Sequence, residues 1–153
     1  IEPSLKVFEH YNIDSKEWTK GVIEELKKHT DRKIIVRAHP GDKRAKDYLR
    51  LNQPGVRITT NPSILQDFFK CHAVVTFNSS PGVAAAVEGI PIFVTDPNPK
   101  MSQAYEVANT DLAEINSPKT FEREKWLEKI SMSHFNYDDL RDGTAWNIIK
   151  DYI

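Results

Sequence analysis

The sequence predicts an α/β protein with a doubly wound, mainly parallel sheet, helices on both faces and a helical C-terminal third. Two observations support this prediction. Apolar residues at helical spacing alternate with short β-branched runs from residue 15 to residue 95, a pattern typical of parallel strands joined by crossover helices. The chain has 153 residues, of which 39% are hydrophobic, which suffices for one domain with its own core.

The first helix is predicted over residues 15–29. Asp14 precedes it as a cap, and Glu17 stands at the capping-box position. Its apolar face is formed by four residues at helical spacing, namely Trp18, Val22, Ile23 and Leu26. The β-branched run over residues 33–38 then predicts a buried strand, which the sequence His39-Pro40-Gly41 ends.

The next elements are a short helix over residues 45–51 and a turn at Pro54-Gly55 that leads into a strand over residues 56–59. Ser63 is expected to cap a helix that runs through residue 69. Four apolar residues of that helix are expected to be buried, namely Ile64, Leu65, Phe68 and Phe69.

Residues 73–77 are the clearest strand, and the turn over residues 78–82 leads directly into a helix over residues 83–88. A further strand is expected over residues 91–95, and then helices over residues 102–107, 121–132 and 144–152. Trp126 and Trp146 are expected to be packing residues of the last two. Right-handed crossovers make this order a doubly wound, Rossmann-like sheet.

Composition and charge narrow the function classes. The formal net charge is −1 and the chain has a single cysteine, Cys71, so we expect no nucleic-acid partner, no internal disulfide and a cytoplasmic location. No apolar run approaches the roughly 20 residues that a membrane span needs. Four histidines show no metal-ligand spacing, which predicts no metal site: His10, His29, His72 and His134.

The strongest candidate site is the turn between the strand over residues 73–77 and the following helix. Helix N-termini bind phosphate because their first amides lack partners. Asn78, Ser79 and Ser80 add polar side chains there, and Gly82 would let a ligand approach the backbone. The alternative interpretation, which we hold equally open, is a serine cap followed by a tightly packed helix.

Two other strand ends carry candidate residues. His39 ends the strand over residues 33–38, where an imidazole can donate a hydrogen bond to a phosphate or act as an acid, and we assign it the catalytic role. The alternative interpretation is a histidine that only ends a strand. Arg37 points to the same face. Asp96 follows the strand over residues 91–95 and is a candidate ligand for a ribose hydroxyl, and Lys100 a candidate for a phosphate. Each also fits an ordinary loop.

The segments "IIVRAHPGD" and "SILQDFFKCHAVVTFNSSPGVAAAVEGIPIFV" resemble the C-terminal, donor-binding domain of GT-B glycosyltransferases. The likeness is greatest to capsular polysaccharide and Kdo-type transferases and to sialyltransferases with His-Pro and Ser-Ser motifs. The stretch "MSQAYEVANTDLAEINSP" is similar to glycosyltransferase-like proteins that include phage-encoded ones. The resemblance implies that His39 with Pro40, and Ser79 with Ser80, bind the phosphate of a sugar nucleotide.

The resemblance further implies a CMP-, UDP- or GDP-sugar as donor and no required cofactor. The acceptor glycan and the catalytic base would belong to an N-terminal domain, and the start at Ile1 favours a fragment of such a two-domain protein, inactive alone. Many GT-B enzymes carry an acidic residue where this chain has Ala84. Two alternatives stay open, namely a nucleotide-sugar 2-epimerase fragment and a non-catalytic interaction module.

Overall fold

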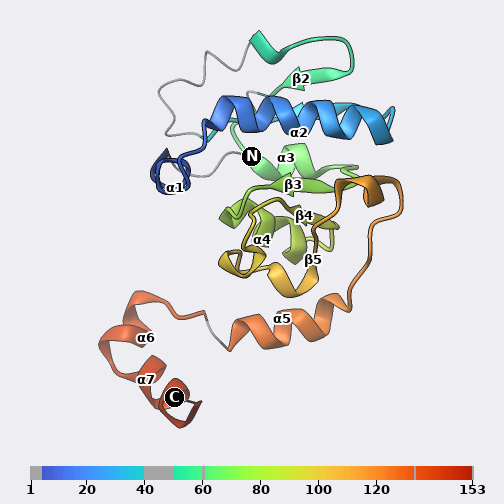
Figure 1. Ribbon diagram of the computed structural model, residues 1–153. Coiled ribbons are helices and arrows are strands. Elements are labelled where there is room, and N and C mark those ends of the chain that lie inside the picture. Colours follow the sequence, from blue (N-terminus) through green and yellow to red (C-terminus); the bar gives the residue numbers. More distant parts are fainter. Residues whose placement is uncertain (1–4, 40–49, 60, 133, 153) are drawn as a thin grey trace. The chain divides into compact units, whose positions relative to one another are not determined.

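The computed structural model describes residues 5–39, 50–59, 61–132 and 134–152. The chain divides into two compact units, Ile1–Thr120 and Phe121–Ile153. The helices and strands of each unit are labelled in Figure 1. In the described ranges, no helix combines the length and the apolar character that a membrane span requires.

Two helices begin the first unit. Helix α1 (Leu5–His10) was not predicted from the sequence, whereas α2 (Ser15–His29) has the predicted bounds. The Asp14 side chain accepts hydrogen bonds from the Lys16 and Glu17 amides, which satisfies two of the donors that a helix start leaves open. Ile23 and Leu26 are buried, as their spacing predicts.

The strands form two parallel sheets. Strand β1 (Ile34–Val36) pairs with β2 (Val56–Ile58). The second sheet has the order β3-β4-β5, with β3 at Val74–Thr76, β4 at Ile92–Val94 and β5 at Ala108–Asn109. The α/β class and the parallel pairing are therefore as predicted, and β5 is an additional strand.

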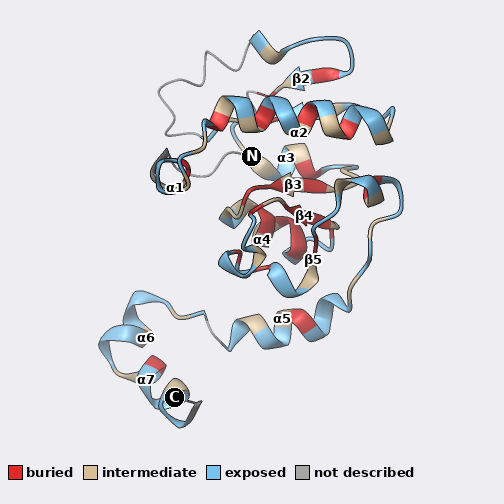
Figure 2. Cartoon of the chain, viewed as in Figure 1, coloured by how far each residue is buried: buried red, intermediate tan, exposed pale blue. Residues whose placement is uncertain are grey.

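Helices cover both faces of the second sheet. Leu26 of α2 lies in one buried cluster with Phe93 of β4, and Ala73 and Val75 pack against that cluster. Thr76 points to the opposite face, where it meets Gly82 of α4 (Ser80–Val87). The colouring in Figure 2 accordingly shows β3, β4 and part of α4 as the most buried region.

Helix α2 also covers the first sheet. Ile23 is buried against Val36 of β1 and Val56 of β2, and Ile34 packs against both this cluster and the cluster around Leu26. The two sheets therefore share one covering helix. The remaining elements of the unit are α3 (Ile64–Phe68) and the 3-10 turns η2 (Pro99–Met101), η3 (Tyr105–Val107) and η4 (Leu112–Asn116).

The second unit is helical, as predicted for the C-terminal part. It contains α5 (Arg123–Ser131), α6 (Tyr137–Arg141), α7 (Thr144–Ile149) and the 3-10 turn η5 (Lys150–Tyr152). Helix α6, which was not predicted, begins with a capping box between Asn136 and Asp139. Trp126 is buried and lies edge-on to Phe121.

Four burial predictions are wrong. Leu65 is 57% exposed, Phe69 77% and Trp146 59%, and Ile35, in the strand predicted to be buried, is 43% exposed. Helical spacing shows which residues share a face, but it does not show whether another element covers that face. The predicted helix over residues 45–51 lies mostly outside the described residues, as do Pro40 and Gly41.

Candidate functional site

The candidate site is the serine bend, Asn78-Ser79-Ser80, which joins β3 to α4. Ser79 is the N-cap residue of α4, and its side chain makes no capping bond. The Gly82 amide donates to the Ser79 carbonyl at 2.9 Å, and Pro81 has no N–H. In the described part of the chain the Ser80 amide and hydroxyl have no hydrogen-bond partner, so Ser80 offers the open donors of this helix start.

Thr76 sets the direction of the Ser79 hydroxyl. Thr76 is fully buried, its Oγ1 accepts from the Ser79 amide at 3.2 Å, and it lies 2.6 Å from Ser79 Oγ. A buried hydroxyl needs an acceptor for its own proton. Either hydroxyl can be the donor in this contact, which holds Ser79 Oγ against the buried threonine.

Gly82 has a packing role. A Cβ on Gly82 would lie 2.9 Å from Thr76 Cγ2, closer than carbon atoms approach without a shift. The glycine therefore lets α4 lie close against β3. The predicted contact between a ligand and Gly82 stays a prediction.

Asn78 and Asp96, both predicted as site residues, lie together. Asp96 follows β4 and is only 4% exposed. Its Oδ2 accepts from Asn78 Nδ2 at 2.6 Å, and its Oδ1 accepts from the Asn98 amide at 2.8 Å. These bonds compensate the burial of the carboxylate. Asp96 therefore holds the bend to the end of β4, and little of it is open to a ribose.

Aromatic residues from the N-terminal segment cover this edge of the sheet. Phe8 is buried, with its ring centroid 5.3 Å from that of Phe77, and Tyr11 lies 5.3 Å from Phe77 at a steep angle. Trp18 Nε1 donates to Thr95 Oγ1 at 3.0 Å. Sequence reasoning missed Phe8 and Tyr11, because nothing local in the sequence links them to strands more than 60 residues later.

Tyr11 connects the aromatic residues to the buried carboxylate. Its hydroxyl donates to Asp96 Oδ2 at 3.3 Å. Loss of contact with water, and then the charge and hydrogen bond of Asp96, raise the pKa of the Tyr11 phenol above its ordinary value. Tyr11 is therefore a neutral donor near pH 7.

His39 lies at the carboxyl end of β1 and is exposed. The bend lies at the carboxyl end of β3, in the other sheet, and in the described part of the chain no ladder joins the two sheets. The pairing of His39 with the serine bend therefore stays a prediction. Lys100, the other predicted phosphate ligand, is exposed in η2.

Arg37 forms an ion pair with a residue of α3. Its Nη1 lies 2.7 Å from Asp67 Oδ2, and both side chains are largely buried. Asp67 Oδ1 also accepts from Thr59 Oγ1 at 2.9 Å and from Asn61 Nδ2 at 2.5 Å. The carboxylate of α3 thus ties together the carboxyl ends of β1 and β2.

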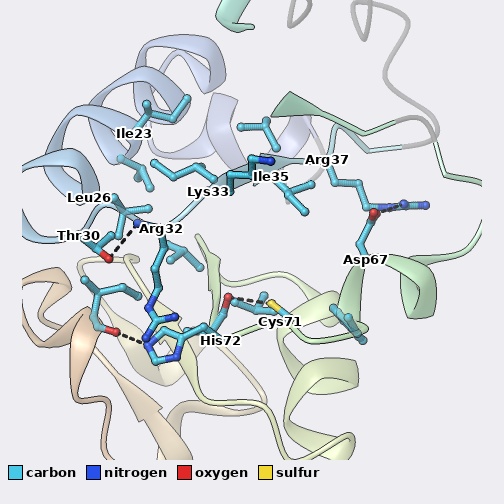
Figure 3. Close-up of a pocket in the computed structure, with 18 of the residues that line it drawn as sticks. Ile23, Leu26, Thr30, Arg32, Lys33, Ile35, Arg37, Asp67, Cys71 and His72 are labelled. Carbon is cyan, nitrogen blue, oxygen red and sulfur yellow. Dashed lines mark hydrogen bonds and ion pairs between the residues drawn. The ribbon is translucent and has the colours of Figure 1, made fainter. Parts of the chain in front are cut away.

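A pocket of about 540 Å³ separates β1 from β3. Figure 3 shows Ile35 and Lys33 of the β1 segment on one side and Cys71 and His72, just before β3, on the other. Its lining includes two unbroken runs of the chain, residues 32–37 and 67–75, together with one face of α2. Such runs show that strand edges, and not only side chains, border the space.

Cys71 and His72 are held by main-chain carbonyls. Cys71 Sγ donates to the Ala73 carbonyl at 3.1 Å, and His72 Nε2 lies 2.7 Å from the Ile115 carbonyl. Burial raises the pKa of the Cys71 thiol, which therefore stays protonated near pH 7. In the ranges that the structure describes, no group of three His, Cys, Asp or Glu side chains is placed to hold a metal ion.

No family model, curated protein or solved structure matches the chain.

Proposed function

We propose that the chain is the sugar-nucleotide-binding half of a glycosyltransferase with two α/β domains. The observation that carries the proposal is the serine bend. It offers an amide and hydroxyl protons at the carboxyl edge of a parallel sheet, which is where α/β proteins bind nucleotides. In this proposal Ser79 and Ser80 hold the phosphate of a CMP-, UDP- or GDP-sugar, without a metal.

The proposal includes one doubly wound sheet, with β1 beside β3. The connections support it, because β1 and β2 are parallel in one sheet, β3 and β4 are parallel in the other, and helices separate β2 from β3 and β3 from β4. The shared covering helix α2 supports it as well. In such a sheet the strand order would reverse between β1 and β3, and both strands would end at the ligand.

His39 is proposed as the catalytic residue, because an imidazole next to the leaving phosphate would neutralise the charge that develops on it. The acceptor glycan and the catalytic base are proposed to come from a second domain across the cleft, in the cytoplasm. In this proposal Asp96 holds the serine bend in place and does not bind the ligand, since its carboxylate already accepts hydrogen bonds from Asn78 and Asn98.

A non-catalytic interaction module is the second candidate. It is favoured by Ala84, which stands where many GT-B enzymes have an acidic residue, and by the small number of open donors at the bend. Such a module would keep the fold without binding a nucleotide.

Calorimetric titration with CMP, UDP and GDP tests the proposal. At least one nucleotide is expected to bind, and Ser79→Ala combined with Ser80→Ala is expected to weaken binding about 100- to 10,000-fold, because two hydrogen bonds to charged groups contribute about 1.5–3 kcal/mol each. Ser63→Ala, at the cap of α3, is the matched control and should leave affinity unchanged. Absence of binding by all three nucleotides would reject the donor-binding function in favour of the module.

A further inference from the structure

Among the residues that the structure describes, one edge of β1 has no strand paired with it. The Ile34 amide donates to the Gly55 carbonyl, and the Thr59 amide donates to the Val36 carbonyl, so residues 34 and 36 direct their main chain toward β2. Alternation along a parallel strand then turns the N–H and C=O of Ile35 to the opposite edge. The Ile35 side chain is 43% exposed. This edge faces the pocket.

One edge of β3 likewise has no strand partner within the described ranges. The Val74 amide donates to the Pro91 carbonyl, and the Thr95 amide donates to the Thr76 carbonyl, so residues 74 and 76 are directed toward β4. Ala73 and Val75 therefore turn their main chain away from β4, and both line the same pocket. The Cys71 thiol donates to the Ala73 carbonyl, an acceptor that a neighbouring strand would otherwise use.

The side chains of β1 and β3 alternate between the two faces in a way that would let the two open edges pair. Ile34 and Val36 face α2, as do Ala73 and Val75. In a parallel pairing that keeps these faces together, the Ile35 N–H meets an acceptor on Ala73 or Val75, and the Ile35 C=O meets the next donor along β3. No side chain would have to change face for a ladder to form.

We propose that β1 pairs with β3 when ligand binds, which closes the pocket, joins the two sheets in the order β2-β1-β3-β4-β5 and assembles the site. This inference rests on the proposed function, because it concerns how that same site is regulated. Unpaired strand edges are templates for a further strand. The N–H and C=O groups on the open edge of β1 could pair with those on the open edge of β3.

Closure would carry His39 to the serine bend. His39 lies four residues after Ile35, just as Asn78 lies four residues after Val74. If Ile35 lies opposite Val74, His39 lies opposite Asn78, and in the next register that keeps the faces it lies opposite Ser80. A phosphate held by both His39 and the bend binds the closed arrangement only, so binding and strand pairing are coupled.

Amide hydrogen exchange with and without UDP, CMP or GDP tests the inference. At a nucleotide concentration of about 100 times the Kd, exchange of the Ile35 and Val75 amides is expected to slow by about 100-fold. The Ile34 and Val36 amides are the internal control. They belong to the β1–β2 ladder in both arrangements, and their exchange should change much less.

The outcomes separate the two proposals. Nucleotide binding measured by calorimetry without added protection of Ile35 and Val75 would overturn the closure and leave donor binding intact. Full protection of both amides in the free protein would also overturn the closure and leave donor binding intact, because the sheet would then already be joined. Absence of binding would overturn both.

A variant pair provides a second test. Ile35→Pro removes only the N–H that points into the pocket, so the β1–β2 ladder can persist, as circular dichroism would check, but β1 can no longer donate to β3. Nucleotide affinity is expected to fall at least about 10-fold. Ile35→Ala keeps the amide and should bind within about 3-fold of the original chain. Equal affinity of the two variants would contradict the closure.

Discussion

Gly82 shows how one residue sets the distance between helix and sheet. Its Cα faces the buried Thr76 side chain, and the first turn of α4 begins with Ser80 and Pro81. The same Thr76 orients the Ser79 hydroxyl. Packing and the polarity of the bend are therefore linked through one threonine.

Gly82→Ala is expected to destabilise the chain by about 1–3 kcal/mol, because the new methyl group overpacks against Thr76. Gly21→Ala is the matched control on α2. A Cβ there meets nothing within 4 Å, and a stabilisation of about 0.5–1 kcal/mol is expected from helix propensity. Chemical denaturation measures both. Combining Gly82→Ala with Thr76→Ser, which removes the clashing methyl group, should restore most of the loss; no restoration would contradict the contact.

Asp96 and Tyr11 make a second residue-scale prediction, on pH dependence. Because the folded state raises the Tyr11 pKa, the stability linked to it is fully present below the unfolded pKa and is lost as pH rises through the folded value. Asp96→Asn removes the charge but not the burial, so the Tyr11 pKa should fall part of the way to its ordinary value.

Ring-carbon NMR titration of tyrosine measures that change. Asp111→Asn, at the exposed cap of η4, is the control and should leave the Tyr11 titration in place. An unchanged Tyr11 pKa in Asp96→Asn would contradict the hydrogen bond between the two side chains.

At the residue scale, the sequence predicts Asn78 and Asp96 as site residues because each follows a parallel strand, and the structure shows their side chains hydrogen-bonded to each other. Sequence reasoning assigned Asp96 to a ribose, whereas the structure shows its oxygens occupied by Asn78, Asn98 and Tyr11. A pattern places a carboxylate at a strand end. It does not reveal which neighbours reach it from distant segments.

At the scale of elements, the Asp67 carboxylate is the main polar connection around β1. It accepts from Arg37 on the β1 side and from Thr59 and Asn61 on the β2 side. Strands of three residues have few ladder bonds of their own, so the network fixes where both strands end.

Asp67→Ala is expected to destabilise the chain by about 3 kcal/mol, because it leaves the largely buried Arg37 without its counter-charge. Replacing both partners, with Arg37→Met and Asp67→Leu, should cost less than the single change. Urea denaturation of the three chains measures this. A single variant as stable as the original chain would contradict a structural role for the pair.

The elements differ in how well the sequence predicted them. Helix α2 was predicted to the residue, because Asp14 is a strong cap and the apolar spacing continues over 15 residues. Helix α4 begins three residues before its predicted start, because Ser80 and Pro81 enter the first turn. The predicted helix over residues 102–107 is wrong, because only the 3-10 turn η3 forms there. The 3-10 turns η2 and η4 and the two-residue strand β5 lack a periodic signal, and Trp146 of α7 is exposed despite its helical spacing.

For the whole molecule, the predicted α/β class is confirmed and the sheet is in two parts. The sequence indicates which strands are parallel through the helices between them, but no local pattern encodes whether two edges are hydrogen-bonded. One proposed site includes the open edges of β1 and β3 and the bend at the end of β3. In that proposal, the pairing of the two sheets depends on the ligand.

The most direct test is an amide NMR titration of the whole chain with UDP, CMP and GDP. We predict that the largest chemical-shift changes fall on Ser79, Ser80 and His39, with smaller changes at Ile35 and Val75. Changes confined to other strand ends or to residues 121–153, or none with any nucleotide, would contradict a phosphate site at the serine bend.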